Sequence, residues 1–413
     1  MSILRPFKAI RPTADFAASV AALPYDVMNS AEAAEMVKGN PYSFLHVDKA
    51  EIDLPAGTDL YSDAVYAKAA ENLDKLVADG ICTQEETPCL YLYRQVMNGR
   101  PQTGIVGCAS IDDYMNNIIK KHEHTRADKE ADRIRHVDTC DANTGPIFLC
   151  YSRKASVDAV IDRYLATEPV YDFTTEDGIK NTVWRIADAN DIAVLTDAFA
   201  KIPALYIADG HHRCASAVKV GLKRREANPD FTGEEEFNFF LCVCFRADEL
   251  EIMDYNRLLA DLNGNTEDEL LEKLAVCFEI EPNDTVYKPS ERHTFGLYLG
   301  KKWYALTLKD GLCDENDPVA SLDVSVLQKN VIEPIFGIDD PRTSKRIDFV
   351  GGIRGLKELE RRCEDDMVCA FAMYPTSLDE LMRIADAGEI MPPKSTWFEP
   401  KLLSGLFIHK LSD

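Results

Sequence analysis

The chain has 413 residues, of which 46% are hydrophobic, 9% aromatic and 28% charged. This ordinary globular composition excludes collagen-like, coiled-coil and wholly disordered proteins. Lys and Arg total 46 against 70 Asp and Glu, and the formal net charge of -24 disfavours binding to nucleic acid or to anionic membrane surfaces. The 12 cysteines include no CxxC pair, and no apolar stretch reaches the roughly 20 residues of a membrane span, so we expect a cytoplasmic protein with neither a nucleic-acid nor a membrane partner.

The first 88 residues are predicted to form an N-terminal region of short loops and helices. Residues 32–38 have the pattern of a short helix behind a possible Ser30 cap. Residues 63–79 have the pattern of a longer helix with Ala, Leu and Val on one face. Between these helices, residues 40–47 are predicted as a turn that runs into a strand.

Residues 89–248 are predicted to form a core in which strands and helices are mixed. Residues 90–96 and 104–111 are expected to pair, because Asn98-Gly99 between them is a strong hairpin turn. Cys242 and Cys244 alternate in an apolar run and would share one strand face, where thiols behave as small hydrophobic groups. Residues 118–121 are predicted as strand or loop, and the other predicted strands are 147–151, 182–186, 204–208 and 237–245. The predicted helices are 126–136, 156–166, 191–199 (with Asn190 as a possible cap) and 214–227.

Residues 249–413 are predicted to form a C-terminal α+β region. Its predicted helices are 266–277, 322–335, 354–363 and 378–387, and its predicted strands are 294–299, 303–308 and 367–374. The chain as a whole therefore predicts an α/β (α+β) fold with a mixed sheet, divided into regions 1–88, 89–248 and 249–413.

The sharpest chemical signal is the run Asp209-Gly210-His211-His212-Arg213, between an apolar strand and a helix. A strand-turn-helix junction exposes unpaired N–H groups and the positive end of a helix dipole, which together bind anions. Gly210 would let the backbone approach a phosphate, and Arg213 supplies a guanidinium fork for phosphate oxygens. Asp209 could hold a metal ion or orient a histidine. The alternative is a tight turn whose histidines only cap the helix.

A second cluster of titratable residues spans 121–133. Glu123 lies among histidines and basic residues, and could act as a general base if burial tunes its pKa. Thr125 or Asp128 could cap the helix that follows. Three basic residues spaced to share one helical face could reach a triphosphate or an acidic substrate: Arg126, Lys129 and Arg133. A solvated charged helix is an equally good interpretation of the same run. No Walker A loop, GxGxxG fingerprint or GxSxG elbow is present.

The box at residues 209–213 resembles the phosphate-binding box of the ParB/sulfiredoxin superfamily, in which a glycine and a basic pair open a helix. The whole chain resembles domain-of-unknown-function family 1015. Besides the box, the matching pieces are Arg5-Pro6-Phe7, Pro24-Tyr25-Asp26-Val27, Asn40-Pro41-Tyr42-Ser43-Phe44, His122-Glu123 with Thr125 and Arg133, and Met391-Pro392-Pro393-Lys394-Ser395-Thr396. Sulfiredoxin has its catalytic cysteine where this chain has His211, so sulfinic-acid reduction is not expected.

The resemblance implies that residues 89–248 form a ParB/sulfiredoxin-like nucleotide-binding core. It also implies similarity to free L-serine kinases, which make O-phosphoserine with ADP or ATP and use a glutamate as general base. Glu123 is the residue that could match this glutamate, with Asp209 as a second catalytic residue and Mg²⁺ ligand. The box from Gly210 to Arg213 would bind the nucleotide phosphates. Further substrate or phosphate contacts implied by the matching pieces are His122, Thr125, Arg133 and Lys394.

The sequence is compatible with two other functions. His122 and His124, with Asp209, His211 and His212, could form a two-metal site of a metal-dependent hydrolase. The chain could also be a non-catalytic nucleotide-binding regulatory protein. The sequence does not choose between ATP and ADP, and it is silent on the oligomeric state.

Overall fold

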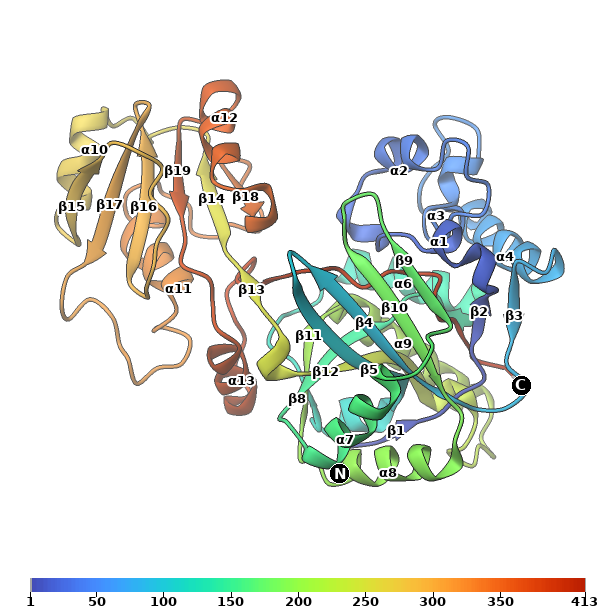
Figure 1. Cartoon of the computed structure of the whole chain (residues 1–413). Coiled ribbons are helices and arrows are strands. Elements are labelled where there is room, and N and C mark those ends of the chain that lie inside the picture. The colour runs from blue at the N-terminus through green and yellow to red at the C-terminus, as the bar shows by residue number, and fades with distance from the viewer. Residues whose placement is uncertain (1, 413) are drawn as a thin grey trace. The chain divides into compact units, whose positions relative to one another are not determined.

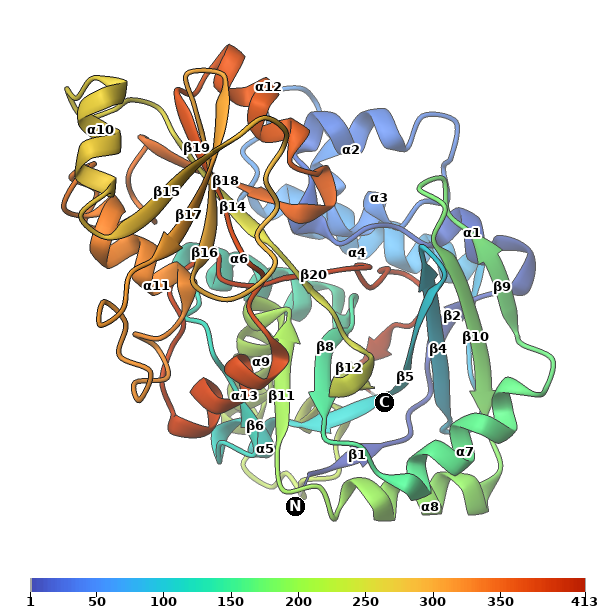
Figure 2. The same cartoon turned by 60° about the vertical axis from the view of Figure 1, so that its left-hand side comes forward.

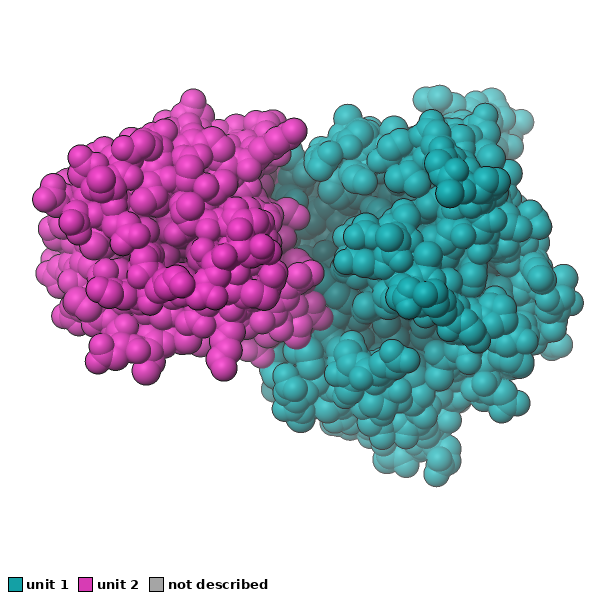
Figure 3. Space-filling view, turned by 90° about the horizontal axis from the view of Figure 1, so that it is seen from above, with its two compact units in different colours: residues 1–250, 400–413 teal, residues 251–399 magenta. Residues whose placement is uncertain are grey.

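The computed structural model describes residues 2–412, which divide into two compact units. Unit 1 comprises Met1–Leu250 and Pro400–Asp413, and unit 2 comprises Glu251–Glu399 (Figure 3). Unlike the regions expected from the sequence, the structure has no division near residue 88. The reason is a shared hydrophobic core, in which side chains from the first 88 residues pack with Cys140, Ala142 and Ile408.

Unit 1 is built on a mixed nine-stranded sheet, whose strand order is β6-β11-β8-β12-β5-β4-β10-β9, with β1 paired to β5 (Figure 1). The strands β6/β11 and β8/β12 run parallel, and the other neighbours are antiparallel. Their bounds are β1 Leu4–Arg5, β4 Leu90–Met97, β5 Arg100–Ser110, β6 Ile119–Lys120, β8 Ile147–Tyr151, β9 Tyr171–Thr174, β10 Lys180–Ile186, β11 Leu205–Asp209 and β12 Phe239–Arg246. The expected α/β class with a mixed sheet is confirmed.

Two local predictions about this sheet are also confirmed. Asn98 and Gly99 both have positive φ, at 52° and 80°, and join β4 to β5 in the tight hairpin that this pair favours. Cys242 and Cys244 are fully buried on one face of β12, with their Sγ atoms 3.8 Å apart. All 12 cysteines belong to the described residues, and all are free thiols.

Among the helices of unit 1, α7, α8 and α9 pack against this sheet in one hydrophobic core, and Figure 2 shows α7 and α8 side by side. Their bounds are α1 Ala17–Val20, α2 Ser30–Met36, α3 Leu45–Asp48, α4 Asp63–Ala78, α5 Ile111–Met115, α6 Ala127–Cys140, α7 Ala155–Leu165, α8 Ala189–Phe199 and α9 His211–Ala227. Four short strands form two small pairs: β2 Ile10–Pro12 with β3 Cys82–Gln84, and β7 Ala142–Asn143 with β21 His409–Lys410. No helix among the described residues is long and apolar enough to cross a membrane.

Three local predictions in unit 1 were wrong. The strand expected within residues 40–47 is the helical turn α3, because Phe44, Leu45 and Val47 all enter the core at helical spacing. The cap of α2 is Asn29 rather than Ser30, since the Asn29 carboxamide accepts hydrogen bonds from two first-turn N–H groups. The cap of α8 is the Asp188 carboxylate, two residues before the expected Asn190, since it accepts hydrogen bonds from the Asn190 and Asp191 N–H groups.

Unit 2 has a six-stranded sheet in the order β15-β17-β16-β19-β14-β18. Its strands are β14 Tyr255–Leu259, β15 Phe278–Asn283, β16 Thr294–Leu299, β17 Lys302–Leu308, β18 Ile347–Gly351 and β19 Cys369–Ala372, and β13 Ile252–Met253 pairs with β20 Trp397–Phe398. Its helices are α10 Glu267–Leu274, α11 Asp323–Leu327, α12 Lys357–Asp365 and α13 Leu378–Ala387. The helix expected over 322–335 ends early, because the chain widens into a π-helical turn, Gln328–Ile332.

Gly221 is the position at which helix α9 comes closest to its surroundings. A Cβ atom there would lie 2.4 Å from the Phe237 carbonyl oxygen and 2.8 Å from Ile111 Cδ1. In an exposed helix, replacing Gly by Ala stabilises by about 1 kcal/mol. We expect Gly221→Ala to do the opposite and destabilise the fold by about 1–3 kcal/mol through overpacking. Urea unfolding checks this, with the exposed Glu226→Ala on the same helix as a control; a stabilised G221A protein would contradict it.

Candidate functional site

The candidate site begins where β11 ends and α9 begins. The pairing of β11 with β8 shifts register between Ile207 and Asp209, a bulge that re-aims the end of the strand. Gly210 follows with a φ of +89° and is the N-cap of α9, so His211, His212 and Arg213 occupy the first turn. The first-turn N–H groups of a helix have no partners within it. The predicted strand-turn-helix junction is therefore confirmed.

Gly210 is required at this junction for two reasons. Its left-handed backbone is one that side chains rarely adopt, and a Cβ would lie only 3.2–3.3 Å from the Arg213 guanidinium. Arg213 itself is nearly buried: Nη1 donates to the Pro146 carbonyl oxygen at 2.7 Å, and Nη2 lies 3.4 Å from Asp209 Oδ2. Its Nε is buried without a hydrogen-bond partner. The folded chain therefore holds a guanidinium with a spare donor directly beside Gly210.

Opposite charges keep both Asp209 and Arg213 ionised in spite of burial. Burial raises the pKa of the Asp209 carboxyl, but Lys401, Arg213 and His211 outweigh it and hold this pKa below its usual value. Burial lowers the pKa of Arg213, but Asp26 and Asp209 outweigh it. The Lys401 ammonium, 3.9 Å from Asp209, arrives from the C-terminal segment of unit 1. Nothing in the sequence pattern pointed to Lys401, since only the fold returns residues 400–413 to this unit.

Glu123 and the box are brought together by the parallel pairing of β6 with β11. Leu205 pairs with Ile119 and Tyr206 with Lys120, so the residues that follow both strands emerge at the same edge. Ligand atoms of His122, Glu123 and His211 all lie within 4.8 Å of one another. The rings of His122 and His211 meet edge to face, with centroids 4.5 Å apart. The expected association of Glu123 with the box thus has a geometric basis.

The two histidines beside Glu123 are neutral and incompletely satisfied. Burial lowers the pKa of His211 to about 4, and burial with the neighbouring His211 lowers the pKa of His122 well below its usual value. Neither ring nitrogen of His122 makes a hydrogen bond of ordinary geometry, and Nε2 of His211 also has none. Buried polar atoms of this kind normally bond to a water, an ion or a ligand group.

His212 has a structural contact instead. Its Nε2 accepts a hydrogen bond from the Arg126 backbone N–H at 3.0 Å, which ties the start of α6 to the start of α9. Burial lowers the pKa of His212, so the ring is neutral. The charge of the box therefore comes from Arg213, and His212 contributes its backbone N–H and its fixed position.

The segment that begins α6 differs from its prediction. Neither Thr125 nor Asp128 is the N-cap: Arg126 takes that position, and its side chain makes no capping hydrogen bond. The Thr125 hydroxyl donates to Glu130 Oε2 at 2.8 Å. Arg126 is 70% exposed and paired with Asp128, so it does not join the other basic residues in one binding face. Thr125 remains a candidate contact only by its place in the chain next to Glu123.

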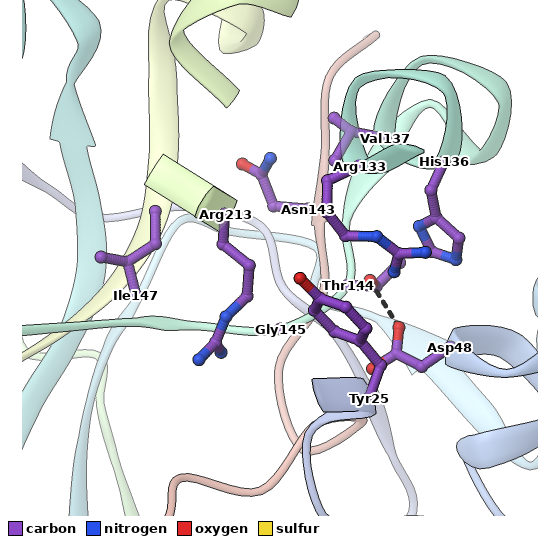
Figure 4. A pocket seen from close by; sticks show the side chains of 10 residues that line it. All are labelled: Tyr25, Asp48, Arg133, His136, Val137, Asn143, Thr144, Gly145, Ile147 and Arg213. Carbon is purple, nitrogen blue, oxygen red and sulfur yellow. Dashed lines mark hydrogen bonds between the residues drawn. The ribbon is translucent and has the colours of Figure 1, made fainter. Parts of the chain in front are cut away.

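Arg133 lies in a small cavity with Arg213 rather than on the surface. The cavity of about 20 Å³ has room for one or two water molecules (Figure 4). The Arg133 guanidinium lies over the Tyr25 ring, 4.1 Å from its centroid, and its Nε donates to Asp132 at 2.9 Å. The cavity is lined by Tyr25, Asp48, Arg133, His136, Val137, Asn143, Thr144, Gly145, Ile147 and Arg213.

Several charged and polar side chains meet at this cavity beside the box. Asp48 Oδ1 accepts from the Thr144 hydroxyl at 2.8 Å, as the dashed line in Figure 4 marks. Although burial opposes it, Asp132, Tyr25 and Asp48 raise the pKa of Arg133, which stays charged. Two buried guanidinium groups on α6 and α9 thus face one pocket.

The last predicted contact, Lys394, belongs to unit 2, where its Nζ lies 5.6 Å from the centroid of the Tyr255 ring.

The sequence matches the family described as "Protein of unknown function (DUF1015)" over residues 4–325. The chain belongs to this family. A search of curated proteins found no match.

Several solved structures are similar to this chain. A free serine kinase variant in complex with AMP has 15% identity and a TM-score of 0.37, covering 75% of this chain and 92% of its own. A conserved hypothetical protein from Pyrococcus furiosus has 15% identity and a TM-score of 0.34, covering 76% and 96%. SbnI from Staphylococcus aureus, with a C-terminal truncation, has 11% identity and a TM-score of 0.39, covering 72% and 85%. Such low scores assign neither a ligand nor a reaction to this chain.

Proposed function

We propose that this protein is a nucleotide-dependent small-molecule kinase that phosphorylates free L-serine to O-phosphoserine with ATP or ADP. The observation that carries the proposal is that a carboxylate oxygen of Glu123 lies within 4.8 Å of a ring nitrogen of His211, which stands in the first turn of α9. Phosphoryl transfer needs positioning and electrostatic stabilisation of phosphate oxygens more than covalent chemistry by the protein. A carboxylate beside a cationic helix N-terminus provides a base and a phosphate cradle in one place. The acceptor is inferred from the resemblance of the sequence to free L-serine kinases.

In this mechanism the first-turn amides of α9 and the Arg213 guanidinium bind the phosphates. The serine hydroxyl oxygen forms a bond to the terminal phosphorus, and the bond from that phosphorus to the nucleotide oxygen breaks. Glu123 accepts the hydroxyl proton, and the leaving nucleotide oxygen keeps the electron pair. Arg213, whose Nε has no other partner, offsets the charge that develops on the phosphate oxygens.

Asp209 is the residue that would contact Mg²⁺. An ionised carboxylate is the hard oxygen ligand that this ion prefers, and Lys401 and Arg213 keep Asp209 ionised. The same two cations compete with a free metal ion, so Mg²⁺ fits this position when it arrives with the nucleotide phosphates. When bound, Mg²⁺ supplies charge neutralisation between the phosphate oxygens.

Mass spectrometry tests the proposal directly. The purified protein is incubated with Mg²⁺ and L-serine, with ATP in one tube and ADP in the other. We expect phosphoserine in one of the two tubes, which also names the donor. Absence of product in both tubes, while a control kinase turns over, would remove serine as the acceptor. Tight nucleotide binding without any turnover over hours would instead support a regulatory nucleotide-binding protein.

One observation favours a second function, a metal-dependent hydrolase. Two neutral histidines and a carboxylate converge at His122, Glu123 and His211, and three of the imidazole nitrogens have no hydrogen-bond partner. Neutral imidazole with carboxylate is a common ligand set for transition metals. Elemental analysis of the purified protein separates the two functions. A transition metal at about one ion per chain supports the hydrolase, and weak Mg²⁺ binding alone supports the kinase.

A further inference from the structure

Unit 2 contains a cavity of about 270 Å³, whose walls are largely apolar. Val324 and Leu327 of α11, Ile332 of the π-helical turn, and Ile347 and Phe349 of β18 line it. Single-turn π-helices are rare and occur often at functional sites. Here the π turn follows α11 directly, and its first and last residues, Gln328 and Ile332, both line the cavity. Its size and composition fit a small ligand with a hydrocarbon body.

Arg257 of β14 brings a charge into this apolar cavity. Its side chain is buried, and Nη1 donates to the Tyr255 carbonyl oxygen while Nη2 donates to the Lys394 carbonyl oxygen at 3.1 Å. The Phe349 ring centroid lies 5.5 Å from its Cζ. Within residues 2–412, no carboxylate forms an ion pair with Arg257, and burial lowers its pKa to about 10. Most other arginines of the chain pair with a carboxylate, among them Arg246, Arg346 and Arg362.

A buried charge without a counterion is costly to the fold. Protein interiors tolerate buried charges when they are paired and hydrogen-bonded. A guanidinium has five N–H donors, and two protein carbonyls account for only two of those on Arg257. An anion in the cavity would provide the missing charge and accept the remaining donors.

The string at residues 391–396 has a clear structural role here. Pro392 and Pro393 line the cavity. The Ser395 hydroxyl donates to the Pro392 carbonyl oxygen at 2.6 Å, and the Thr376 hydroxyl donates to the Ser395 carbonyl oxygen at 3.0 Å. Lys394 has a φ of +59°. These contacts hold the string in a fixed loop that presents the Lys394 carbonyl to Arg257.

We propose that this cavity binds a small organic carboxylate with an apolar body, and that the carboxylate pairs with Arg257. The planar guanidinium fork matches a carboxylate in a bidentate arrangement. The rim argues against a polyanion such as a nucleotide, because Asp339 and Asp340 lie there and Arg342 is already paired with Asp340 at 2.9 Å. The residues that line this cavity all belong to unit 2, whereas Glu123 and the box at residues 209–213 belong to unit 1.

The carboxylate could belong to an α-amino acid or to a simple carboxylic acid, and Asp339 affects the binding of these two ligands differently. This carboxylate is exposed and lines the same cavity, where it would attract an ammonium group. An α-amino acid with an aliphatic side chain would then bind more tightly than its deaminated analogue. If the site is instead specific for simple carboxylic acids, the acid that lacks the ammonium group would bind more tightly than the amino acid.

Calorimetry on the full chain, without nucleotide, tests the proposal with three probes: 4-methylpentanoate, 4-methylpentanamide and L-leucine. We expect the acid or the amino acid to bind, and the uncharged amide to bind at least about tenfold more weakly, because it cannot pair with the guanidinium. Tighter binding of L-leucine than of 4-methylpentanoate identifies an amino-acid site, and the reverse identifies a site for simple acids. The proposal is overturned if the amide binds as tightly as both, or if none of the three gives saturable binding.

Variants locate the binding within the cavity. Arg257→Gln should weaken binding of the acid by about tenfold or more while leaving amide binding nearly unchanged. Arg361→Gln is the matched control, since it removes the same charge from an exposed position on α12 of the same unit. Equal loss in both variants would overturn the assignment to Arg257. If circular dichroism shows that R257Q does not fold, the comparison of acid with amide on the wild-type protein decides the question.

Discussion

Replacing Glu123 by Gln is expected to abolish phosphoryl transfer while leaving nucleotide affinity nearly intact. The amide keeps the size of the side chain but cannot accept the proton of the serine hydroxyl. General bases contribute about 10²–10⁴ to a rate, so the kcat for phosphoserine formation should fall by that factor. Initial-rate kinetics with quantified phosphoserine, together with calorimetric titration of ATP and ADP, provide both measurements.

The matched control for this variant is Glu226→Gln, at the exposed far end of α9. It removes the same charge from the same helix and should turn over at the wild-type rate. Wild-type turnover in E123Q would remove Glu123 from the role of base. If E123Q also lost nucleotide binding, this would show instead that Glu123 maintains the structure of the nucleotide-binding site.

Replacing Arg213 by Gln is expected to weaken nucleotide binding by about 10–100-fold, since charge-assisted hydrogen bonds to phosphate are each worth about 1.5–3 kcal/mol. The guanidinium has two structural partners, the Pro146 carbonyl and Asp209. Some loss of stability should therefore accompany the loss of binding. Nucleotide titration and urea unfolding of the same protein separate the two effects.

Two further variants show whether charge or geometry matters at this position. Arg213→Lys keeps the charge but loses the fork, and it should recover only part of the affinity. Arg163→Gln, at an exposed position on α7, removes an equal charge and should bind nucleotide like the wild type. Unchanged affinity in R213Q would contradict a phosphate-binding role for the box.

Most helices of the fold could be predicted from local sequence, but several strands were missed, among them β14, β15 and β18 of unit 2. The Asn98-Gly99 hairpin, the apolar run of β12 and the strand-turn-helix at residues 205–227 all depend on neighbouring residues. The errors lie where a tertiary contact overrides the local pattern. The α3 turn forms because its apolar residues enter a core shared with distant segments, and the helix after residue 322 widens into a π turn whose first residue, Gln328, donates to the Ile338 carbonyl.

The candidate site was predicted in part. The box could be predicted because a glycine, two histidines and an arginine adjoin one another in the chain. The proximity of Glu123 to that box could only be a hypothesis, since 86 residues separate it from Asp209 and the register of β6 against β11 brings them together. Lys401 and Asp48 carried no chemical signal of their own, because each is a common residue whose surroundings come from other segments. Tyr25 stood out only as part of a piece that resembles the family.

By itself, the sequence determined the composition, the family resemblance and the chemical character of the box at residues 209–213, since these depend on residue types and short spacings. Only the tertiary structure decided which charged side chains are buried and which groups they pair with. It sets Arg213 between Asp209 and the Pro146 carbonyl, and it buries Arg257 beside a cavity with no carboxylate paired to its guanidinium. Burial and pairing depend on segments distant in the chain, so the ionisation and binding capacity of these groups follow from the fold.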